Sequence, residues 1–154
     1  REIMEHMDHT KFVGEDYSFH GGTGAANALT LAAGEATIQT LCDEPVYDRI
    51  DRLGERARTG LVQIFDRLGV DAQVTGIGSL FAIHFTQEKI VRDSKHFSDI
   101  HKAQSRGLFA FLLSRNILVM IPDSLHAAIS YSHSEDEIDG LVSCVEDYSK
   151  ARAR

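Results

Sequence analysis

The sequence predicts an α+β fold in which a small, largely antiparallel sheet is covered by helices. A long stretch from residue 45 repeats apolar residues every three or four positions, which is typical of an amphipathic helix. Residues 74–86 are rich in β-forming residues, and the chain closes with another amphipathic segment. In order, residues 45–154 read as helix, strand, helix, strand, strand, helix, which suits one layer of helices on one face of a sheet.

The first helix follows a glycine-rich loop. Residues 14–27 (GEDYSFHGGTGAAN) combine glycines with other small residues, which suits a backbone that approaches something closely. Good helix formers follow, and Asn27 is placed as an N-cap, so we expect a helix from about Ala28 to about Cys42.

The second helix is expected to begin at Pro45 and to end at Gly69. Its apolar face comprises Val46, Ile50, Leu53, Ala57, Leu61, Ile64 and Leu68. The other face carries charged side chains that we expect to be solvated rather than to form a binding patch: Asp48, Arg49, Asp51, Arg52, Glu55, Arg56 and Arg58.

The remaining elements alternate between the two kinds of structure. Residues 74–86 predict one strand with Phe81, Ile83 and Phe85 on one face, and a polar loop at 87–98 leads to a helix from Ser98 to Ser114. Two short strands are expected at 117–121 and 127–131, around a turn at Pro122. Ser134 and Glu137 form a capping box that begins the last helix.

Composition excludes several classes of protein. The 154 residues suffice for one core, and 16 Lys and Arg against 23 Asp and Glu give a net charge of −7, which disfavours nucleic acid and anionic membranes as partners. No apolar run approaches the roughly 18 residues of a membrane span. Cys42 and Cys144 lie far apart without a CxxC motif, which favours a reducing compartment and predicts a cytoplasmic location.

Several polar clusters have simpler explanations than chemistry. The pairs His6 and His9, and His96 and His101, lack the further ligands of a metal motif, so we expect no metal site. Ser132, His133 and Asp136 are too close in sequence for a triad. The Gly76-x-Gly78 pair precedes a strand, whereas a dinucleotide fingerprint needs a helix after it.

The segment Gly21–Asn27 is the most informative one. Small residues, the Thr23 hydroxyl and unpaired N–H groups at a helix N-terminus make a natural seat for a phosphate. A glycine-rich linker with a capping asparagine explains the same residues equally well, and the residues alone leave both interpretations open.

A family resemblance favours the phosphate. The run HGGTGAANALTLAAGEATIQTL resembles a segment of class III aminotransferases, which are pyridoxal-phosphate enzymes of fold type I. REIMEHM, VTGIGSLFAIHFT and SHSEDEID are similar to other segments of the glutamate-1-semialdehyde aminomutase branch, in the same order and across almost the whole chain. Motifs that keep both order and spacing are far more specific than any one of them.

The resemblance implies a cofactor, a partner and a domain division. Gly22 and Thr23 would hold the phosphate of pyridoxal 5'-phosphate, and in this family the threonine serves the neighbouring subunit, which implies a homodimer. Residues 1–36 would end the large cofactor-binding domain, and 37–154 would form the small C-terminal domain. An amino donor and an amino acceptor, both small molecules, would be the substrates.

The chain also departs from the family pattern. No lysine here has the context of the family's Schiff-base lysine, which lies before a glycine-rich run upstream of all these motifs; the lysines are Lys11, Lys89, Lys95, Lys102 and Lys150. Because a Schiff base needs that amine, we expect no catalytic residue in this chain and no transamination by it alone. The start at Arg1, inside a segment with helical character, agrees with a piece of a longer protein. Ala26 and Ala28 replace a glycine and a proline of the family pattern.

The substrate expectation follows from two missing residues. Residues 129–133 (ISYSH) lack the arginine with which many class III aminotransferases grip a carboxylate, which fits the aminomutase-like branch. The glutamate usual before this strand in the aminomutases is also missing. An aminomutase-like aminotransferase acting on an amino acid or amino-aldehyde is therefore favoured. A non-catalytic α+β interaction module and a general phosphate-binding domain remain the alternatives.

Overall fold

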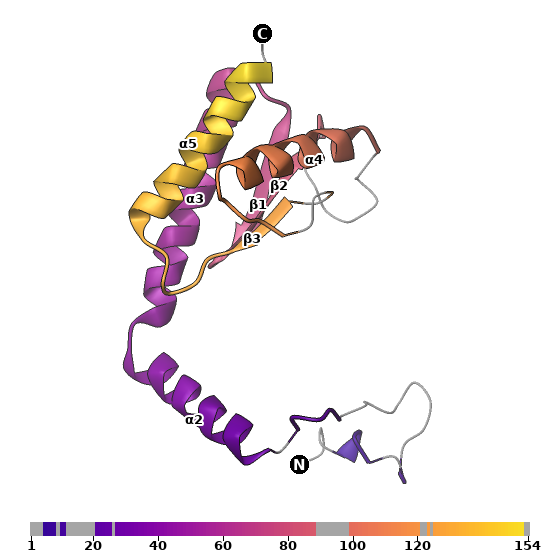
Figure 1. Ribbon diagram of the computed structural model, residues 1–154, viewed down its shortest axis with the longest axis vertical. Coiled ribbons are helices and arrows are strands. Elements are labelled where there is room, and N and C mark those ends of the chain that lie inside the picture. Colours follow the sequence, from indigo (N-terminus) through magenta and orange to yellow (C-terminus); the bar gives the residue numbers. More distant parts are fainter. Residues whose placement is uncertain are drawn as a thin grey trace. The chain divides into compact units, whose positions relative to one another are not determined.

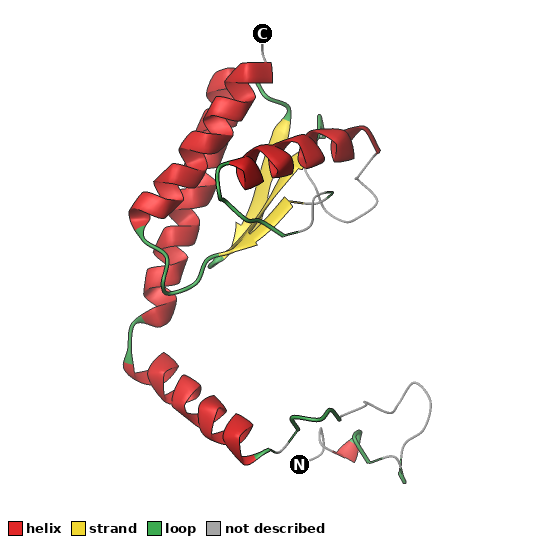
Figure 2. Cartoon of the chain, viewed as in Figure 1, coloured by secondary structure: helices red, strands yellow, loops and turns green. Residues whose placement is uncertain are grey.

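The computed structural model describes residues 5–8, 10–11, 21–25, 27–88, 99–120, 123 and 125–152, with the side chains of 99–101 excepted. The chain divides into two compact units, Arg1–Glu44 and Pro45–Arg154. The division falls after Glu44, whereas the predicted boundary after residue 36 lies inside a helix. Figure 1 labels the elements and Figure 2 colours them by type.

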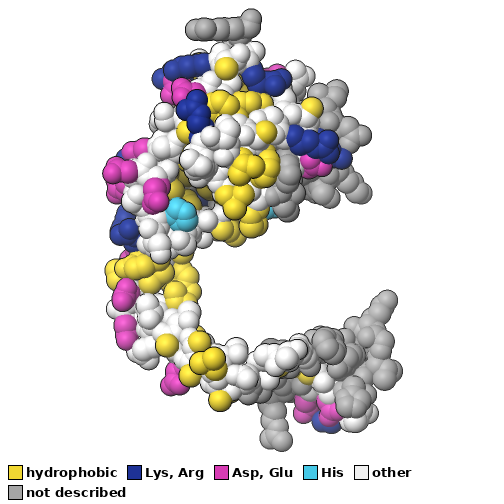
Figure 3. Space-filling view, in the orientation of Figure 1, with side chains coloured by type: hydrophobic (Ala, Val, Ile, Leu, Met, Phe, Trp, Pro, Cys, Tyr) yellow, Lys and Arg dark blue, Asp and Glu magenta, His cyan; other side chains and the backbone are white. Residues whose placement is uncertain are grey.

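The first unit contains helix α2, Ala28–Asp43. The Asn27 side chain accepts a hydrogen bond from the Leu29 N–H at 2.9 Å, so the predicted helix and its N-cap are both confirmed. None of its residues is buried, and Leu29, Leu31 and Ile38 are exposed. Apolar side chains accordingly lie on the surface of this helix (Figure 3). Residues 1–4 and 12–20 lie outside the described residues, as does part of the predicted N-terminal helical segment.

Helix α3, Val46–Leu68, opens the second unit. Gly69 ends it in the left-handed conformation with φ of 63°, and the Val70 N–H returns to the Phe65 carbonyl at 2.9 Å, as a helix C-terminus with glycine predicts. The predicted apolar face faces the core, where these side chains of α3 are buried: Val46, Leu53, Ala57, Leu61, Ile64 and Phe65.

The single strand expected at 74–86 is wrong, because this segment belongs to a hairpin. Strand β1, Ala72–Ile77, pairs antiparallel with β2, Leu80–Phe85, across a two-residue turn at Gly78 and Ser79. Gly78 has φ of 57°, which suits a tight hairpin turn. A Gly-Ser pair between β-forming runs is itself a hairpin signal, and reading it as the opening of one strand missed it.

The second half of the sheet also differs from expectation. Helix α4, Asp99–Ser114, confirms the predicted helix, and β3, Leu125–Ala128, pairs antiparallel with β2. The strand expected at 117–121 is wrong over its described residues 117–120, where only Met120 makes an isolated bridge to His126. Tertiary packing explains the misreading, because Val119 is buried in the core without pairing in the sheet. The strand expected at 127–131 begins two residues earlier than predicted and ends at Ala128.

Helix α5, Glu135–Arg152, completes one layer of helices on the sheet. It runs parallel to α3, as shown by the contacts of Arg56 with Asp139 and of Arg67 with Glu146 (Figure 1). Phe81, Ile83 and Phe85 of β2 share a core cluster with residues of α3, α4 and α5. The three-stranded sheet has the order β1-β2-β3, so the predicted α+β class with a small antiparallel sheet is confirmed.

Candidate functional site

The predicted phosphate site lies in the turn before α2. The Ala25 N–H donates to the Gly22 carbonyl at 3.0 Å, and the Asn27 N–H donates to the Gly24 carbonyl at 3.3 Å. Gly22 has φ of 143°, a conformation that side-chain-bearing residues rarely adopt, and nothing lies within 4 Å of where its Cβ would be. The backbone at Gly22 is thus open to a close approach.

The Thr23 side chain is exposed in this turn. It precedes by five positions the first residue of α2, where unpaired N–H groups favour an anion. The Asn27 carboxamide already occupies the Leu29 N–H, which leaves part of the first turn for a ligand. The structure therefore places Gly22 and Thr23 together in an accessible turn, while Ala26 lies outside the described residues.

None of the described lysines sits in a buried pocket of the kind that activates an amine. Lys11 is an exposed turn residue 3.9 Å from Glu5, and Lys150 near the end of α5 pairs with Glu146. Lys102 lies half-buried on α4. Lys89 and Lys95 lie outside the described residues.

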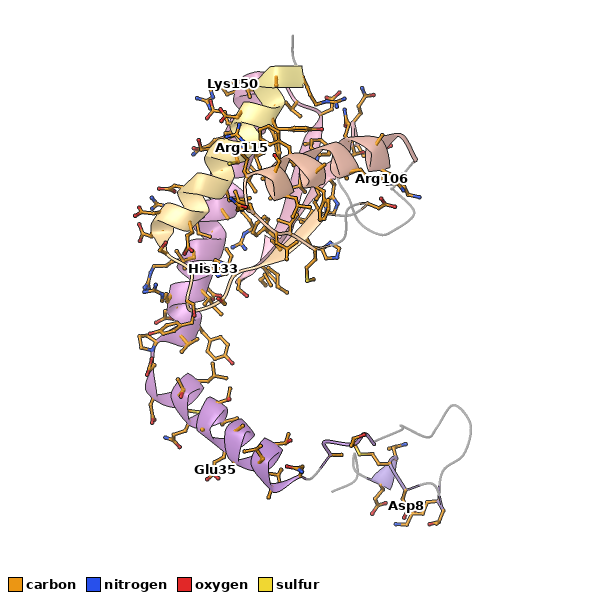
Figure 4. The ribbon with its side chains drawn as sticks, in the orientation of Figure 1. Asp8, Glu35, Arg106, Arg115, His133 and Lys150 are labelled. Carbon is orange, nitrogen blue, oxygen red and sulfur yellow. The ribbon has the colours of Figure 1, made fainter. Side chains whose placement is uncertain are left out.

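The loop between β3 and α5 is held by its own side chains. His133 lies here, beside α3 (Figure 4), and its Nδ1 accepts a hydrogen bond from the Ser130 N–H at 3.0 Å. The Ser134 N–H donates to Glu137 at 2.7 Å and the Glu137 N–H donates back to the Ser134 hydroxyl, so the predicted capping box is confirmed. These Ser134 contacts lower the pKa of Glu137. His133 thus bonds to Ser130 and not to Ser132.

Arg49, which lies on the predicted solvated face of α3, binds this same loop. Arg49 of α3 donates from Nε to the Tyr131 carbonyl at 3.1 Å and from Nη2 to the His133 carbonyl at 3.0 Å. Its guanidinium also lies 5.2 Å from the centre of the Tyr131 ring, within cation–π range. The loop contains no arginine of its own, but the fold supplies one from 82 positions away in sequence. No local sequence signal indicates this contact.

Two further arginines of α3 bind groups outside the helix, and one of them is largely buried. The Arg58 side chain is only 15% exposed and donates to the Gly78 carbonyl at 2.6 Å. Arg56 grips both carboxylate oxygens of Asp139 at 2.7 Å and lies 3.0 Å from Glu135. The hydrogen bonds from Arg56 hold the pKa of Asp139 below its usual value. The expectation of a solvated face is therefore wrong for Arg58, whereas Arg49 and Arg56 are exposed as expected although each also binds another segment.

Two histidines lie on the face of the sheet that points away from the helices. His84 of β2 is 8% exposed, and its Nε2 lies 2.7 Å from the Thr75 hydroxyl on β1. Burial, and to a smaller extent the neighbouring His126 on β3, lowers the pKa of His84. His84 therefore favours its neutral form at neutral pH.

The described segments contain neither a cluster of metal ligands nor a helix suited to span a membrane. Among the side chains that can be placed, no three His, Cys, Asp or Glu residues cluster as metal ligands do. His9, His96 and the side chain of His101 lie outside what the structure describes. Over the same described segments, no helix is both long and apolar enough to cross a bilayer.

The chain belongs to the class-III aminotransferase family, whose model matches residues 1–144. A curated relative, glutamate-1-semialdehyde 2,1-aminomutase 2 of Lachnoclostridium phytofermentans, is 30% identical over 97% of this chain and 34% of its own length. The chain thus spans about a third of the length of the curated relatives that it matches.

Solved structures of transaminases share the fold. An omega-transaminase from Sphaerobacter thermophilus superposes with a TM-score of 0.75 and 29% identity, over 97% of this chain and 33% of the transaminase. A transaminase with pyridoxal phosphate bound gives a TM-score of 0.66 and 26% identity, over 91% of this chain and 32% of that one. The family resemblance noted in the sequence is therefore confirmed.

Proposed function

We propose that this chain is the C-terminal portion of a pyridoxal-phosphate-dependent aminotransferase or aminomutase of class III. The observation that carries the proposal is the family match over residues 1–144, which includes the glycine-rich turn at Gly22 and Thr23. The chain spans about a third of its relatives, and its own described lysines lack the surroundings of a Schiff-base amine. We therefore expect no transamination by the chain alone.

The turn at Gly22 and Thr23 fits the phosphate of the cofactor. An exposed hydroxyl, a glycine whose Cβ position is open, and the N-terminus of a 16-residue helix are the groups that phosphates bind. When bound, pyridoxal phosphate supplies an electron sink for the amino carbon of the substrate. The role of this chain is to bind the phosphate through the Thr23 hydroxyl and neighbouring N–H groups, and so to orient the cofactor.

The proposal extends to the assembly and the setting of the protein. We propose a cytoplasmic homodimer in which Thr23 serves the neighbouring subunit, with residues 1–36 as the end of the large domain and 37–154 as the small one. The exposed apolar side chains of α2, including Leu29 and Leu31, support packing against a further surface. The substrates are a small amino donor and acceptor, of the amino acid or amino-aldehyde type.

Cofactor affinity in a full-length protein that contains this chain tests the phosphate site. Thr23→Ala should weaken binding of pyridoxal phosphate by about tenfold or more, because a hydrogen bond to a charged group is lost. Thr37→Ala is the matched control, since the Thr37 hydroxyl donates to the Ala33 carbonyl within α2. Equal affinities for the two variants would refute the site.

Mixed dimers test whether the threonine acts across subunits. In the full-length protein, a Thr23→Ala subunit can be combined with a subunit whose Schiff-base lysine is replaced. If Thr23 serves the partner, one site of the mixed dimer receives both intact groups and regains activity. At a cofactor concentration that leaves the Thr23→Ala homodimer mostly empty, a mixed dimer no more active than that homodimer refutes the shared site. A full-length protein that never forms a borohydride-stable adduct between lysine and cofactor refutes the enzyme and favours the non-catalytic module.

A further inference from the structure

A hollow on the second unit is lined by three arginines. It lies along α3 at the start of α5 and has a volume of about 490 Å³, within the range of small-molecule sites. Its lining residues are Arg49, Arg52, Leu53, Glu55, Arg56, Thr59 and Glu135. All of them belong to one compact unit, so the hollow does not depend on the Gly22 and Thr23 turn.

The two acidic side chains in the hollow are already committed to other groups. Glu55 accepts hydrogen bonds from Arg58 at 2.9 Å and from the Thr59 hydroxyl at 3.2 Å. The bond from Arg58, which is the larger effect, and that from Thr59 lower the pKa of Glu55. Glu135 pairs with Arg56, which is also gripped by Asp139. Neither Glu55 nor Glu135 forms an ion pair with Arg49 or Arg52.

Arg49 and Arg52 consequently make no ion pair with a described carboxylate, although Asp48 in the first turn of α3 precedes Arg52 by four positions. Arg49 bonds to two uncharged carbonyl oxygens, which hold its guanidinium in place without cancelling its charge. Arg52 is exposed and makes no ion pair with any described carboxylate. The acid on the adjacent position, Asp51, is directed toward Gly78 in the hairpin turn, since its Oδ1 lies 2.9 Å from where a Gly78 Cβ would be.

The three-residue spacing of Arg49 and Arg52 on α3 suits a small molecule with two carboxylates. Residues three apart lie on the same helix face with Cβ atoms about 5–6 Å apart, so the two guanidinium groups can each face one carboxylate of the same small molecule. Guanidinium groups match carboxylates by paired hydrogen bonds, which Arg52 can offer. Arg49 offers its Nη1 to the second carboxylate, because its Nε and Nη2 donate to carbonyl oxygens. We propose that this hollow binds a small dicarboxylate through Arg49 and Arg52, as a site separate from that of the cofactor phosphate.

Titration of the 154-residue chain with succinate at low ionic strength tests the site. The Nε–H signal of Arg52 in ¹H–¹⁵N NMR spectra should shift in a saturable way, whereas acetate should bind at least about fivefold more weakly because it engages one arginine. Inorganic phosphate, a compact anion, should also bind more weakly than succinate. Potassium chloride at matched ionic strength accounts for screening.

Arg52→Gln is the diagnostic variant, because Arg52 is exposed and its removal leaves the packing of α3 intact. It should weaken succinate binding by about fivefold or more. Arg67→Gln is the matched control on the same helix, since Arg67 pairs with Glu146 at 2.9 Å and lies outside the hollow. Equal losses in the two variants, no saturable shift, or acetate and phosphate binding as tightly as succinate would each overturn the proposal. Circular dichroism melting verifies that both variants fold.

Discussion

Gly54 is the position at which a single methyl group should disturb the small domain most. It lies buried in α3, against the hairpin turn between β1 and β2. A Cβ at this position would lie 2.0 Å from the carbonyl oxygen of Gly78 and 3.0 Å from its carbonyl carbon. Since a Cβ essentially never approaches another atom within 3.0 Å, helix and turn must separate by at least about 1 Å.

The cost of Gly54→Ala follows from three effects. Overpacking of this kind costs about 1–3 kcal/mol. Arg58 donates to the same Gly78 carbonyl at 2.6 Å, and disturbing a hydrogen bond from a charged group adds about 1.5–3 kcal/mol. Alanine recovers about 1 kcal/mol through its better helix propensity. We therefore expect the free energy of unfolding to fall by about 1.5–5 kcal/mol.

Urea denaturation followed by circular dichroism measures this change, with Gly140→Ala as the control. Gly140 lies within α5, and nothing lies within 4 Å of its Cβ position. The control should therefore be stabilised by up to about 1 kcal/mol. If Gly54→Ala proves as stable as Gly140→Ala, the close approach of α3 to the turn is not as described and the reasoning fails.

Three further predictions concern the same unit. Leu61 is 0% exposed in the core, so Leu61→Ala should lower the free energy of unfolding in urea by about 2–5 kcal/mol, whereas Leu31→Ala, at a side chain 61% exposed on α2, should change it by no more than about 0.5 kcal/mol. Ser134→Ala removes the capping box of α5 and should cost about 1 kcal/mol by the same measurement, with Ser143→Ala on α5 as a control expected to be nearly neutral. Because the pKa of His84 is lowered by burial, the unfolded chain takes up a proton before the folded one as the pH falls, so stability should decline between about pH 7 and 5 and His84→Gln should flatten this part of the curve. Arginines lower the pKa values of Glu55 and Asp139, so protonation of these carboxylates should reduce stability only at lower pH. If His84→Gln loses as much stability between about pH 7 and 5 as the unmodified chain, the pH dependence does not come from His84.

Local signals in the sequence located most of the helices. Helix ends are set by contacts within a few residues, and three of them lie as predicted: Asn27 begins α2, Gly69 ends α3, and the Ser134–Glu137 pair begins α5. The apolar spacing of α3 likewise indicates its buried face, because one side of a helix repeats every 3.6 residues. The glycine-rich turn could also be recognised, because its glycines and the Thr23 hydroxyl are neighbours in the sequence.

The strands were harder to predict because their pairing is not local. Residues 117–120 have strand-like composition, yet Val119 is buried in the core and only Met120 bridges to a strand, at His126. The segment before β2 forms a separate strand, β1, and the turn between β1 and β2 at Gly78 contacts α3. Such outcomes depend on which surfaces meet, a choice that strand propensity does not encode.

The class of the fold, the family and the turn at Gly22 and Thr23 could be predicted from the amino-acid sequence, because composition, helix signals and ordered motifs reside in consecutive residues. The partners of the charged residues on α3 could not be predicted in this way, because they depend on how distant segments pack. Arg49 and Arg56 lie 82 to 84 positions away in sequence from the Tyr131 and His133 carbonyls and the Asp139 carboxylate that they bind. Arg52, on the same helix, makes no ion pair with a described carboxylate. A charge is visible in a sequence, but the group that neutralises it is set by folding, which brings distant segments together.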